Sequence, residues 1–456
     1  MDETRKTIVF AGAAVILALA AFIFSPSRIT PEAFLDQGEP FYPEFTDPNE
    51  ATTLEVIDYN ESSGTARPFK VTFKNGRWTI PSHHDYPADA KERLAQTAAG
   101  VIDIKKDDFR TSNAADHERC GVVDPLDATA PGLSGRGSRI TLKGADDRIL
   151  ADYIVGYEVP DREGFRFVRI PGQNRVYAAR MNIEISTNFA DWIETNLLQI
   201  TGDKIDRVML KDYSIDERTR SVIPRDNIEL KRDDEQEWTM AGLPKGKQLD
   251  SATVQTMMST LSGLQIVGVR PKPEGLSASL TDPAGGDISQ EGRLSLQSKG
   301  YFFTRDGQLM SNEGELNVRT SDGVIYILRF GEVLYGSGLE VTAGAAEAGE
   351  TGSDGQGQAN RFLFVAAGFE PGYFKKPPEP RSRDYLEKAD SLWTEADRQN
   401  KERQDALDAW QRKVEHGQEL ASDLNNRFAD WYYVISEDSF DKIHLTREAL
   451  TAKSES

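Results

Sequence analysis

Apolar and polar residues alternate through residues 53–80, the period of a β-strand with one buried face. Asn75-Gly76 interrupts this stretch and favours a two-residue hairpin turn, because both residues tolerate positive φ. Apolar positions then recur at helical spacing in YPADAKERLAQTAAGV, residues 86–101. The pattern predicts a strand hairpin followed by one helix, whose buried face consists of Leu94, Ala98 and Val101.

The same order returns in residues 228–267. A strand pattern ending at Trp238 parallels the one that ends at Trp78, and a helical pattern follows each of them. Pro87 suits the first turn of the first helix, and Asp250 suits the N-cap of the second. The second helix is expected to bury Val254, Met258 and Leu261.

The tetrapeptide Phe-Ala-Asp-Trp occurs twice, at residues 189–192 and 428–431. Asp-Lys-Ile follows each occurrence at similar spacing, so we interpret the tetrapeptide as the closing segment of a duplicated α+β unit. The two units are expected at 52–204 and 205–445. Within each tetrapeptide, Phe and Trp three residues apart fit a helical turn that packs on the core; a paired ligand-binding motif is the alternative.

Two insertions make the second copy longer. Residues 341–359 have the composition of a Gly/Ala/Glu linker-like loop. Residues 381–428 follow a cluster of prolines and have the charged composition of a long helix, with a partial apolar stripe that is interrupted near Gly417. Two arrangements are open for this stretch: a helical hairpin folded onto its own domain, or a protruding arm that meets a partner.

The N-terminal segment sets the expected location. Residues 8–24 are uncharged and apolar, and as a helix they would rise about 26 Å, just below the ~30 Å hydrocarbon core of a bilayer. We expect a transmembrane anchor here; a cleaved signal peptide is the alternative, because Ala18-Leu19-Ala20 resembles a cleavage site. Arg5 and Lys6 favour a cytoplasmic N-terminus, which places the bulk of the chain in the periplasm, anchored to the cell inner membrane as a single-pass protein.

These patterns predict an α+β protein with an N-terminal transmembrane helix followed by two related strand-rich α+β repeats, the second with a long helical insertion. The expected segments are a cytoplasmic tip 1–7, the anchor 8–24, a stalk 25–51, the first repeat 52–204, the second repeat 205–445 and a tail 446–456.

Charge and cysteine content narrow the candidate partners. Acidic residues outnumber basic ones by 74 to 54, and the formal net charge is −20. This charge repels phosphate backbones and anionic lipid surfaces, so nucleic acid is not an expected partner. Cys120 is the single cysteine, which excludes an intramolecular disulfide.

Candidate metal ligands are few. His83-His84-Asp85 in one loop and His117-x-x-Cys120 in another could converge on a metal, since the second spacing places both donors on one helical face. No CxxC pair or HExxH motif is present, so a buried structural cysteine and solvated histidines are the preferred interpretation. The stretch 132–137 is not a Gly-x-Ser-x-Gly elbow, and no phosphate-binding glycine loop occurs. We therefore predict no catalytic, cofactor-binding or metal-binding residues.

Several motifs point to a family: a strand pair ending at Trp, a PADA-type helix start, a Gly-[Val/Leu]-x-x-Pro element before an Ile-Thr-Leu strand, and a terminal FADW…KI segment. They lie at 78–101, 121–142 and 426–445, with a weaker second copy at 228–280. Together with the anchor, they resemble bacterial proteins that carry the domain of unknown function numbered 4340, over most of 52–445. The resemblance implies an accessory envelope role beside ABC-type export or gliding-motility-like transporter components, and it supplies no catalytic residues.

The expected function is therefore a non-enzymatic, membrane-anchored scaffold or accessory protein of a membrane complex, with ABC-type transporter subunits as the candidate partner. An extracytoplasmic glycan- or peptide-binding module is the alternative. Exposed aromatic side chains would favour this alternative, whereas burial of the conspicuous tryptophans would weaken it: Trp78, Trp192, Trp238 and Trp431. An envelope hydrolase ranks third.

Overall fold

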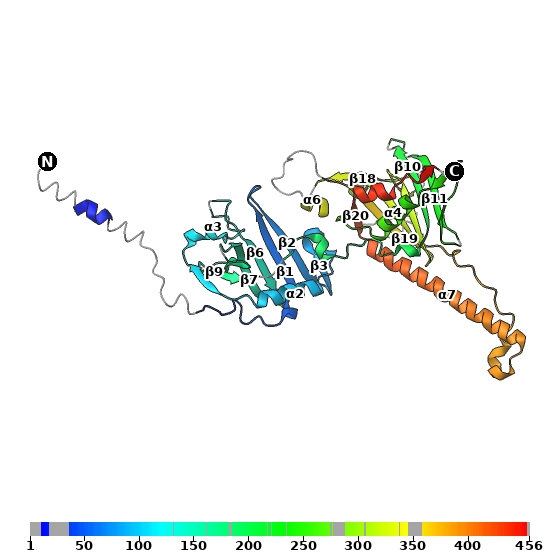
Figure 1. The fold of residues 1–456 in the computed structure, drawn as a ribbon, viewed down its shortest axis with the longest axis horizontal. Helices are drawn as coiled ribbons and strands as arrows, with labels where there is room; N and C mark the ends of the chain where they lie inside the picture. Colours follow the sequence, from blue (N-terminus) through cyan, green and yellow to red (C-terminus); the bar gives the residue numbers. More distant parts are fainter. Residues whose placement is uncertain are drawn as a thin grey trace. The chain divides into compact units, whose positions relative to one another are not determined.

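A computed structural model describes residues 11–17, 36–130, 132–160, 162–181, 185–216, 218–219, 221–233, 235–273, 276, 288–304, 307–336, 338–344 and 358–453 (Figure 1). These residues form two compact units. The first unit contains the described residues up to Thr79 together with Asp89–Thr187, and the second contains Ile80–Ala88 and the described residues from Asn188 onward. The repeat boundary after residue 204 is a statement about sequence duplication and stays a prediction.

The first unit is a sheet with one main helix, in agreement with the predicted α+β class. Short 3-10 turns join some of its elements: η2 Pro48–Glu50, η4 Ala114–Asp116 and η5 Ala145–Asp147. Its strands and α-helices are β1 Thr53–Asn60, β2 Thr65–Lys74, β3 Arg77–Ile80, α2 Lys91–Ile102, β5 Asp108–Thr111, α3 His117–Cys120, β6 Ser138–Lys143, β7 Ile149–Glu158, β8 Phe165–Arg169 and β9 Val176–Arg180.

The second unit contains an eight-stranded sheet, two two-stranded sheets and several helices. Its 3-10 turns are η3 Pro81–His83, η6 Phe189–Trp192, η7 Gly202–Lys204, η8 Asp384–Glu387 and η9 Asp390–Leu392. Its strands and α-helices are β4 Tyr86–Pro87, β10 Ile205–Asp216, β11 Ser221–Arg232, β12 Trp238–Met240, β13 Lys247–Leu249, α4 Ser251–Ser262, β14 Gly268–Pro271, α5 Gln290–Gln297, β15 Tyr301–Phe303, β16 Leu309–Ser311, β17 Glu315–Thr320, β18 Val324–Tyr335, α6 Gly338–Thr342, β19 Ala359–Phe369, α7 Glu395–Phe428, β20 Trp431–Ser436, α8 Glu437–Ile443 and β21 Thr451–Lys453.

The two sheets share one strand order. Eight strands of the first sheet follow each other as β3-β2-β1-β6-β7-β8-β9-β5, and the second sheet runs β12-β11-β10-β17-β18-β19-β20-β14. Each strand in the first series has a counterpart at the same place along the chain in the second series. A duplicated unit requires this correspondence, because strand order is set by non-local pairing that local sequence similarity alone does not impose.

Rows of apolar side chains cross both sheets and form the cores. In the first sheet, Leu54 stands opposite Val71 on β2 and Leu142 on β6, and all three are buried. In the second sheet, Leu316 stands opposite Leu210 on β10 and Leu328 on β18. Alternation of side chains along a strand puts the intervening residues on the other face.

That other face of the second sheet is partly polar. Glu315 on β17 stands between Lys211 on β10 and Arg329 on β18. Its carboxylate is 2.6 Å from the Lys211 ammonium and 3.1 Å from Nε of Arg329. Glu315 is buried, and this double pairing supplies the counter-charges that a buried carboxylate needs.

Local signals in the sequence mark several features correctly. Asn75 and Gly76 have φ of 54° and 79°, as the predicted hairpin turn requires. Helices α2 and α4 bury the faces predicted for them, and the side chain of Asp250 caps α4 by accepting from the backbone N–H of Ala252 at 3.1 Å. Pro87 was placed wrongly in the first turn of α2.

Pro87 lies instead in β4, and α2 begins at Lys91. His84 and Asp85 both have φ of 59°, which breaks the chain direction before the proline. Tyr86 then buries its side chain against aromatic residues of the second unit. Because tertiary burial holds this segment extended, the helix starts only after it.

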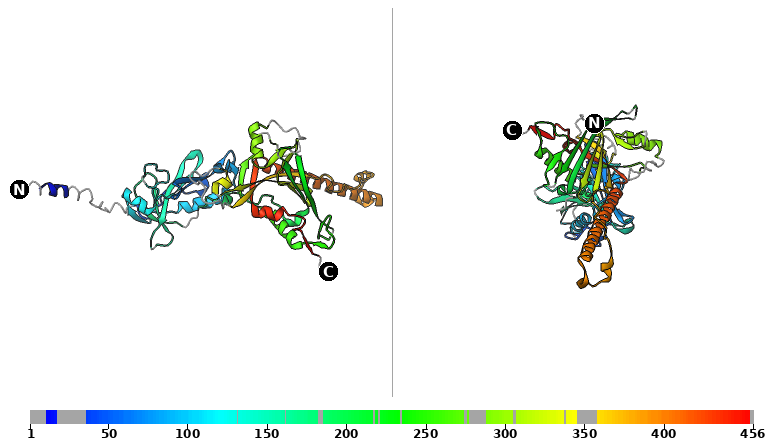
Figure 2. Two further views of the ribbon diagram at one scale, coloured as in Figure 1. Left: turned by 90° about the horizontal axis from the view of Figure 1, so that it is seen from above. Right: turned by 90° about the vertical axis from the view of Figure 1, so that its right-hand side faces the viewer.

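Helix α7 lies inside the stretch 381–428 that was predicted to be a helical insertion. Its C-terminal part packs on β18 and β19, and its Glu395 end projects beyond the sheet (Figures 1 and 2). Gly417, Ala421, Leu424 and Phe428 are the buried residues of the packed part. The helical hairpin left open by the sequence is not what forms: α7 is one continuous helix whose base lies on its unit and whose outer half protrudes. That the protruding half meets a partner stays a prediction.

Parts of two predictions fall outside the described residues. Within 8–24, the structure describes residues 11–17, which are helical, and within 341–359 it describes 341–344 and 358–359. Across the described ranges, no helix has both the length and the apolar character needed to cross a membrane. The tail contributes β21, which pairs with β13.

Candidate functional site

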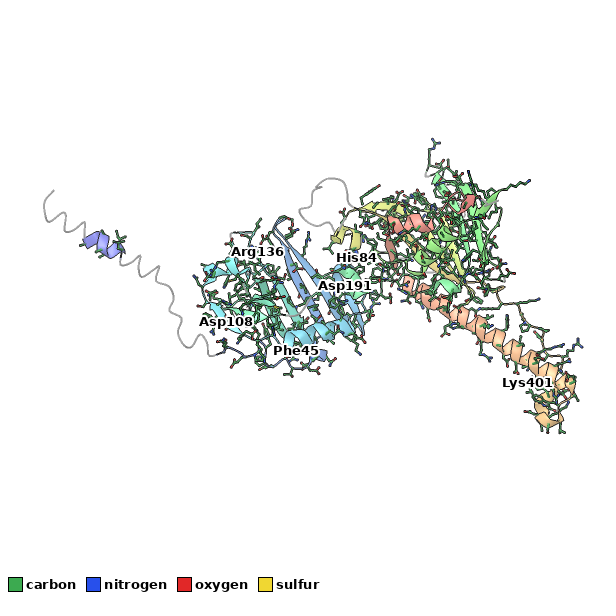
Figure 3. All side chains as sticks on the ribbon, in the orientation of Figure 1. Phe45, His84, Asp108, Arg136, Asp191 and Lys401 are labelled. Carbon is green, nitrogen blue, oxygen red and sulfur yellow. The ribbon has the colours of Figure 1, made fainter. Side chains whose placement is uncertain are left out.

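The candidate ligands His83 and His84 lie in the second unit, on the turn after β3, and the preferred interpretation of both as solvated histidines is wrong for His83. The His83 imidazole is buried, stacks on the ring of Phe189 with 4.1 Å between ring centres, and lies 3.0 Å from the hydroxyl of Thr342 on α6. Burial lowers the pKa of His83 to about 4, and the nearby charges of His84 and Arg270 act in the same direction. His84 Nε2 lies 2.7 Å from the backbone oxygen of Ala343 (Figure 3). Both rings therefore attach their loop to α6.

The candidate pair His117 and Cys120 lies in the first unit, on α3; Cys120 is buried as predicted, whereas His117 is also buried and not solvated. His117 Nε2 is 3.0 Å from the backbone oxygen of Asn174, and Cys120 is buried beside Val122 and Ile154. Burial raises the pKa of the Cys120 thiol, which disfavours the thiolate that binds metals. This pair and the His83 pair lie in different units, and among the described residues no three His, Cys, Asp or Glu side chains are grouped to hold a metal ion.

The two Phe-Ala-Asp-Trp stretches do not occupy equivalent places. The first forms η6 after β9, whereas the second spans the end of α7 and the start of β20. The interpretation of the tetrapeptide as a closing segment common to both repeats is therefore wrong. What the two copies share is burial of their aromatic residues, which fits the predicted role in the core.

Tyr86 brings the two tetrapeptides together within the second unit. Its ring makes edge contacts with Phe189 at 5.7 Å and with Trp431 at 4.9 Å between ring centres. Arg427, just before the second tetrapeptide, donates to the backbone oxygen of Asn196, just after the first, at 2.9 Å. Residues of both tetrapeptides thus contribute to one packed aromatic cluster.

The tryptophans do not form an exposed aromatic platform. Trp192 and Trp431 are buried, while Trp78 and Trp238 are half-buried. Trp78 lies against Phe73 at 5.2 Å, and the Arg232 guanidinium covers Trp238 at 5.2 Å. Sugar recognition by stacking needs an accessible ring face, which Trp192 and Trp431 do not offer.

Lys272 is a residue that sequence reasoning missed. Its ammonium donates to the backbone oxygen of Phe428 at 2.8 Å and lies 4.0 Å from the ring centre of Phe364. Burial lowers the pKa of Lys272 to about 7, although the charge of Asp430 opposes this shift. Phe428 ends α7, so Lys272 supplies a donor and a positive charge to the carbonyl end of that helix. No sequence signal marks it, because its partners come from distant elements.

The outer half of α7 is braced by the chain that leads to it. Residues 370–383, here called the strap, leave β19 and run along the helix. Trp410 donates its indole N–H to the backbone oxygen of Phe374 at 2.9 Å, and Arg381 donates its backbone N–H to the side chain of Asn400 at 3.0 Å. We call residues 370–416, the strap, the turns at its end and the outer part of α7, the arm.

The composition of the strap suits this course. Pro377, Pro378 and Pro380 favour an extended polyproline conformation, in which the seven residue steps from Phe374 to Arg381 span about 22 Å. The ten helical steps from Asn400 to Trp410 rise about 15 Å. The strap is therefore long enough to accompany the helix to its end, and its stiffness limits bending of the arm.

Comparison with known proteins gives one match. The family model described as "Domain of unknown function (DUF4340)" matches residues 78–279. This match supports the resemblance that the motifs predicted over residues 78–279, while the association with transporters stays a prediction. No curated protein and no solved structure matches the chain.

Proposed function

We propose that this protein is a non-enzymatic scaffold or accessory protein of a membrane complex. In this proposal, residues 8–24 anchor it in the inner membrane, the bulk of the chain is periplasmic, and subunits of an ABC-type transporter are the candidate partner. The single observation that carries the proposal is the arm of the second unit.

The outer half of α7 contributes little to the stability of the fold. The residues that α7 buries against the sheet begin at Gly417, and in the outer half only Asp397 is buried. Ordering the arm costs backbone entropy of about 1–2 kcal/mol per residue, which little apolar burial offsets there. A mostly polar helix that is braced against bending is typical of an element that reaches from one body to another.

Two further features support the proposal. The apolar run 8–24 preceded by Arg5 and Lys6 has the pattern of an inner-membrane anchor. The polar clusters described above consist of ion pairs and loop attachments, which suits a protein without a catalytic role. The glycan- or peptide-binding alternative ranks second, since Trp192 and Trp431 are buried.

A pull-down of the tagged full-length protein in mild detergent tests the proposal. The variant to compare lacks residues 376–412 and joins Lys375 to Lys413 through a short glycine-serine linker. This junction is feasible because the Lys413 ammonium lies 5.8 Å from the ring centre of Phe374. The shortened chain keeps the part of α7 that packs on the sheet, including Gly417 and Phe428.

We expect membrane transporter subunits to be recovered with the full-length protein and lost with the shortened variant, as identified by mass spectrometry. Thermal unfolding of both purified proteins serves as the control for folding. Recovery of the same subunits by both forms would refute the arm as the contact. Recovery of no membrane protein by either form would refute the scaffold proposal itself.

A further inference from the structure

The end of the arm is a small folded structure of its own. Residues 384–397, here called the knob, comprise η8, η9 and the first turn of α7; Lys401, labelled in Figure 3, lies on the next turn. Tyr385 is buried, and its ring meets that of Trp393 edge-on at 5.8 Å. The indole N–H of Trp393 donates to the backbone oxygen of Tyr385 at 3.1 Å. These two aromatic residues form the core of the knob.

Polar contacts fix the knob to the helix. Asp397 accepts from the hydroxyl of Thr394 at 2.7 Å and from the ammonium of Lys388 at 2.9 Å. The hydrogen bond from Lys388 and those from Thr394 lower the pKa of Asp397 to about 2. The carboxylate therefore stays ionised and acts both as the capping-box partner of Thr394 and as the counter-ion of Lys388.

Two leucines remain outside this packed structure. Leu386 on η8 is 68% exposed, and Leu392 on η9 is 71% exposed. Among large apolar side chains in the described part of the chain after residue 35, only Tyr335 is comparably exposed. One exposed leucine is ordinary on a protein surface, but two on a rigid knob at the end of a braced arm indicate a contact site.

The charges around these leucines select the partner. Between residues 384 and 396 the single cation is Lys388, whose ammonium is already paired with Asp397. The acidic residues of this stretch are all exposed: Asp384, Glu387, Asp390 and Glu395. Exposed Arg383 and Arg398 flank this stretch, so the knob presents an apolar centre with a rim that is acidic in balance, here called the acidic rim.

We propose that the knob docks into an apolar pocket with a basic rim on a partner protein, and that Leu386 and Leu392 are the anchor residues that enter the pocket. This inference rests on the proposed function and specifies the surface that carries it. A second copy of the chain, with net charge −20 and the same acidic rim, is disfavoured by like-charge repulsion, as is an anionic lipid surface.

Alanine substitution of both leucines tests the anchors in the full-length protein. We expect L386A/L392A to bind the partner roughly 100-fold more weakly, because two leucine side chains no longer become buried on binding. The matched control is L126A/L133A, which removes two leucines that are each 54% exposed in the first unit, and it should bind within about twofold of wild type. Circular dichroism and thermal unfolding verify that both variants fold.

Charge reversal tests the rim. We expect D384K/E387K/D390K to weaken binding by roughly tenfold at low salt, and the difference from wild type to shrink as salt screens the rim. Photo-crosslinking through benzoylphenylalanine at position 386 or 392 should label the partner, and peptide mapping should place the label beside Lys or Arg residues. The same probe at position 126 should not label it.

Each contrary result has a defined meaning. Loss of the partner in the shortened variant, but retention in L386A/L392A, would overturn the knob as the docking site and leave the scaffold function standing. Crosslinks to a second copy of the chain, or to lipid, would overturn the basic-rimmed partner. Recovery of no membrane protein by wild type would overturn both proposals.

Discussion

Eight strands of the first sheet and the eight strands of the second follow the same order, but the connections between them differ, and one connection differs most. In the first sheet, residues 170–175 connect β8 to β9; in the second, residues 370–430 connect the corresponding strands β19 and β20. The antiparallel pairing at this connection is present in both sheets. A sheet thus accommodates a long insertion at a hairpin connection, because strand pairing depends on where the chain returns and only weakly on the length of the loop.

The insertion also completes the sheet that it leaves. β20 pairs with β19 only as far as Leu363, so the rest of that edge of β19 lacks a strand partner. Asn425 on α7 covers this edge: its side chain accepts from the backbone N–H of Ala367 at 2.8 Å and donates to the backbone oxygen of Ala367 at 2.6 Å. The base of α7 therefore belongs to the core, and the arm beyond Gly417 is an addition to it.

The largest expected loss of stability comes from substitutions in the base of α7, whereas substitutions in the arm should have little effect on stability. Phe428 is buried at the base and meets Tyr433 edge-on at 6.1 Å. We expect F428A to reduce the free energy of unfolding by about 3–5 kcal/mol, the usual cost of deleting a buried phenylalanine side chain. L407A, in the arm, should cost less than about 1 kcal/mol, because Leu407 is half-buried. Urea denaturation followed by circular dichroism measures both, and equal losses would mean that the arm is part of the cooperative core.

The next largest effect is a dependence of stability on pH, which we assign to His83. The corresponding segment of the second copy, residues 241–250, contains no histidine. Burial lowers the folded-state pKa of His83 to about 4, below its ordinary value of 6.5. As the pH falls from about 6.5 to 4, His83 is protonated in the unfolded chain but stays neutral in the folded chain. The free energy of unfolding therefore decreases over this window by about 3 kcal/mol.

The variant H83F isolates this contribution. It keeps an aromatic ring beside Phe189 but cannot form the hydrogen bond with Thr342, so we expect its free energy of unfolding at neutral pH to be lower. Because phenylalanine does not titrate, we expect H83F to lose less stability between pH 6.5 and 4. Denaturation midpoints measured across the window for wild type and H83F supply the comparison. Parallel curves would show that the buried imidazole does not govern the acid sensitivity.

A smaller loss of stability is expected from substitution of Gly417, where α7 packs against Phe369 and the backbone of Asp322. A Cβ at this position would lie 2.7 Å from the backbone oxygen of Asp322 and would also clash with the ring of Phe369. Alanine ordinarily stabilises a helix interior by about 1 kcal/mol relative to glycine, but here we expect overpacking to prevail. G417A should therefore lose about 1–3 kcal/mol, while G372A, which meets nothing within 4 Å, should be neutral in thermal denaturation. A stabilised G417A would show that the helix can shift on its seat.

Sequence analysis succeeded where the determining interactions are local. The turn at Asn75-Gly76, the cap at Asp250 and the buried faces of α2 and α4 depend on residues within a few positions of one another. The helical insertion was recognisable from its composition. The placement of Pro87 failed because residues 80–88 pack against distant aromatic side chains, which local propensity does not reveal.

The candidate site was less accessible to sequence analysis. The paired histidines and the His117-Cys120 pair did not converge, since spacing along the chain says nothing about which unit a loop joins. No pattern in the charged stretch marks Leu386 and Leu392 as exposed, because their exposure depends on Tyr385 and Trp393 filling the core of the knob. The apolar stripe is interrupted near Gly417, but α7 continues through this residue, which is buried against the sheet.

The smallest effect should be confined to the end of the arm. Thr394 caps α7 through the reciprocal hydrogen bonds of a capping box with Asp397. T394A should destabilise the first turn of α7 by about 1 kcal/mol, whereas T394S retains the hydroxyl and should behave like wild type. Because the arm lies outside the core, the change should appear as faster amide hydrogen exchange in the knob, with the global unfolding midpoint unaltered. A shift of that midpoint in T394A would instead mean that the knob and the sheet unfold together, and the distinction between arm and core would no longer hold.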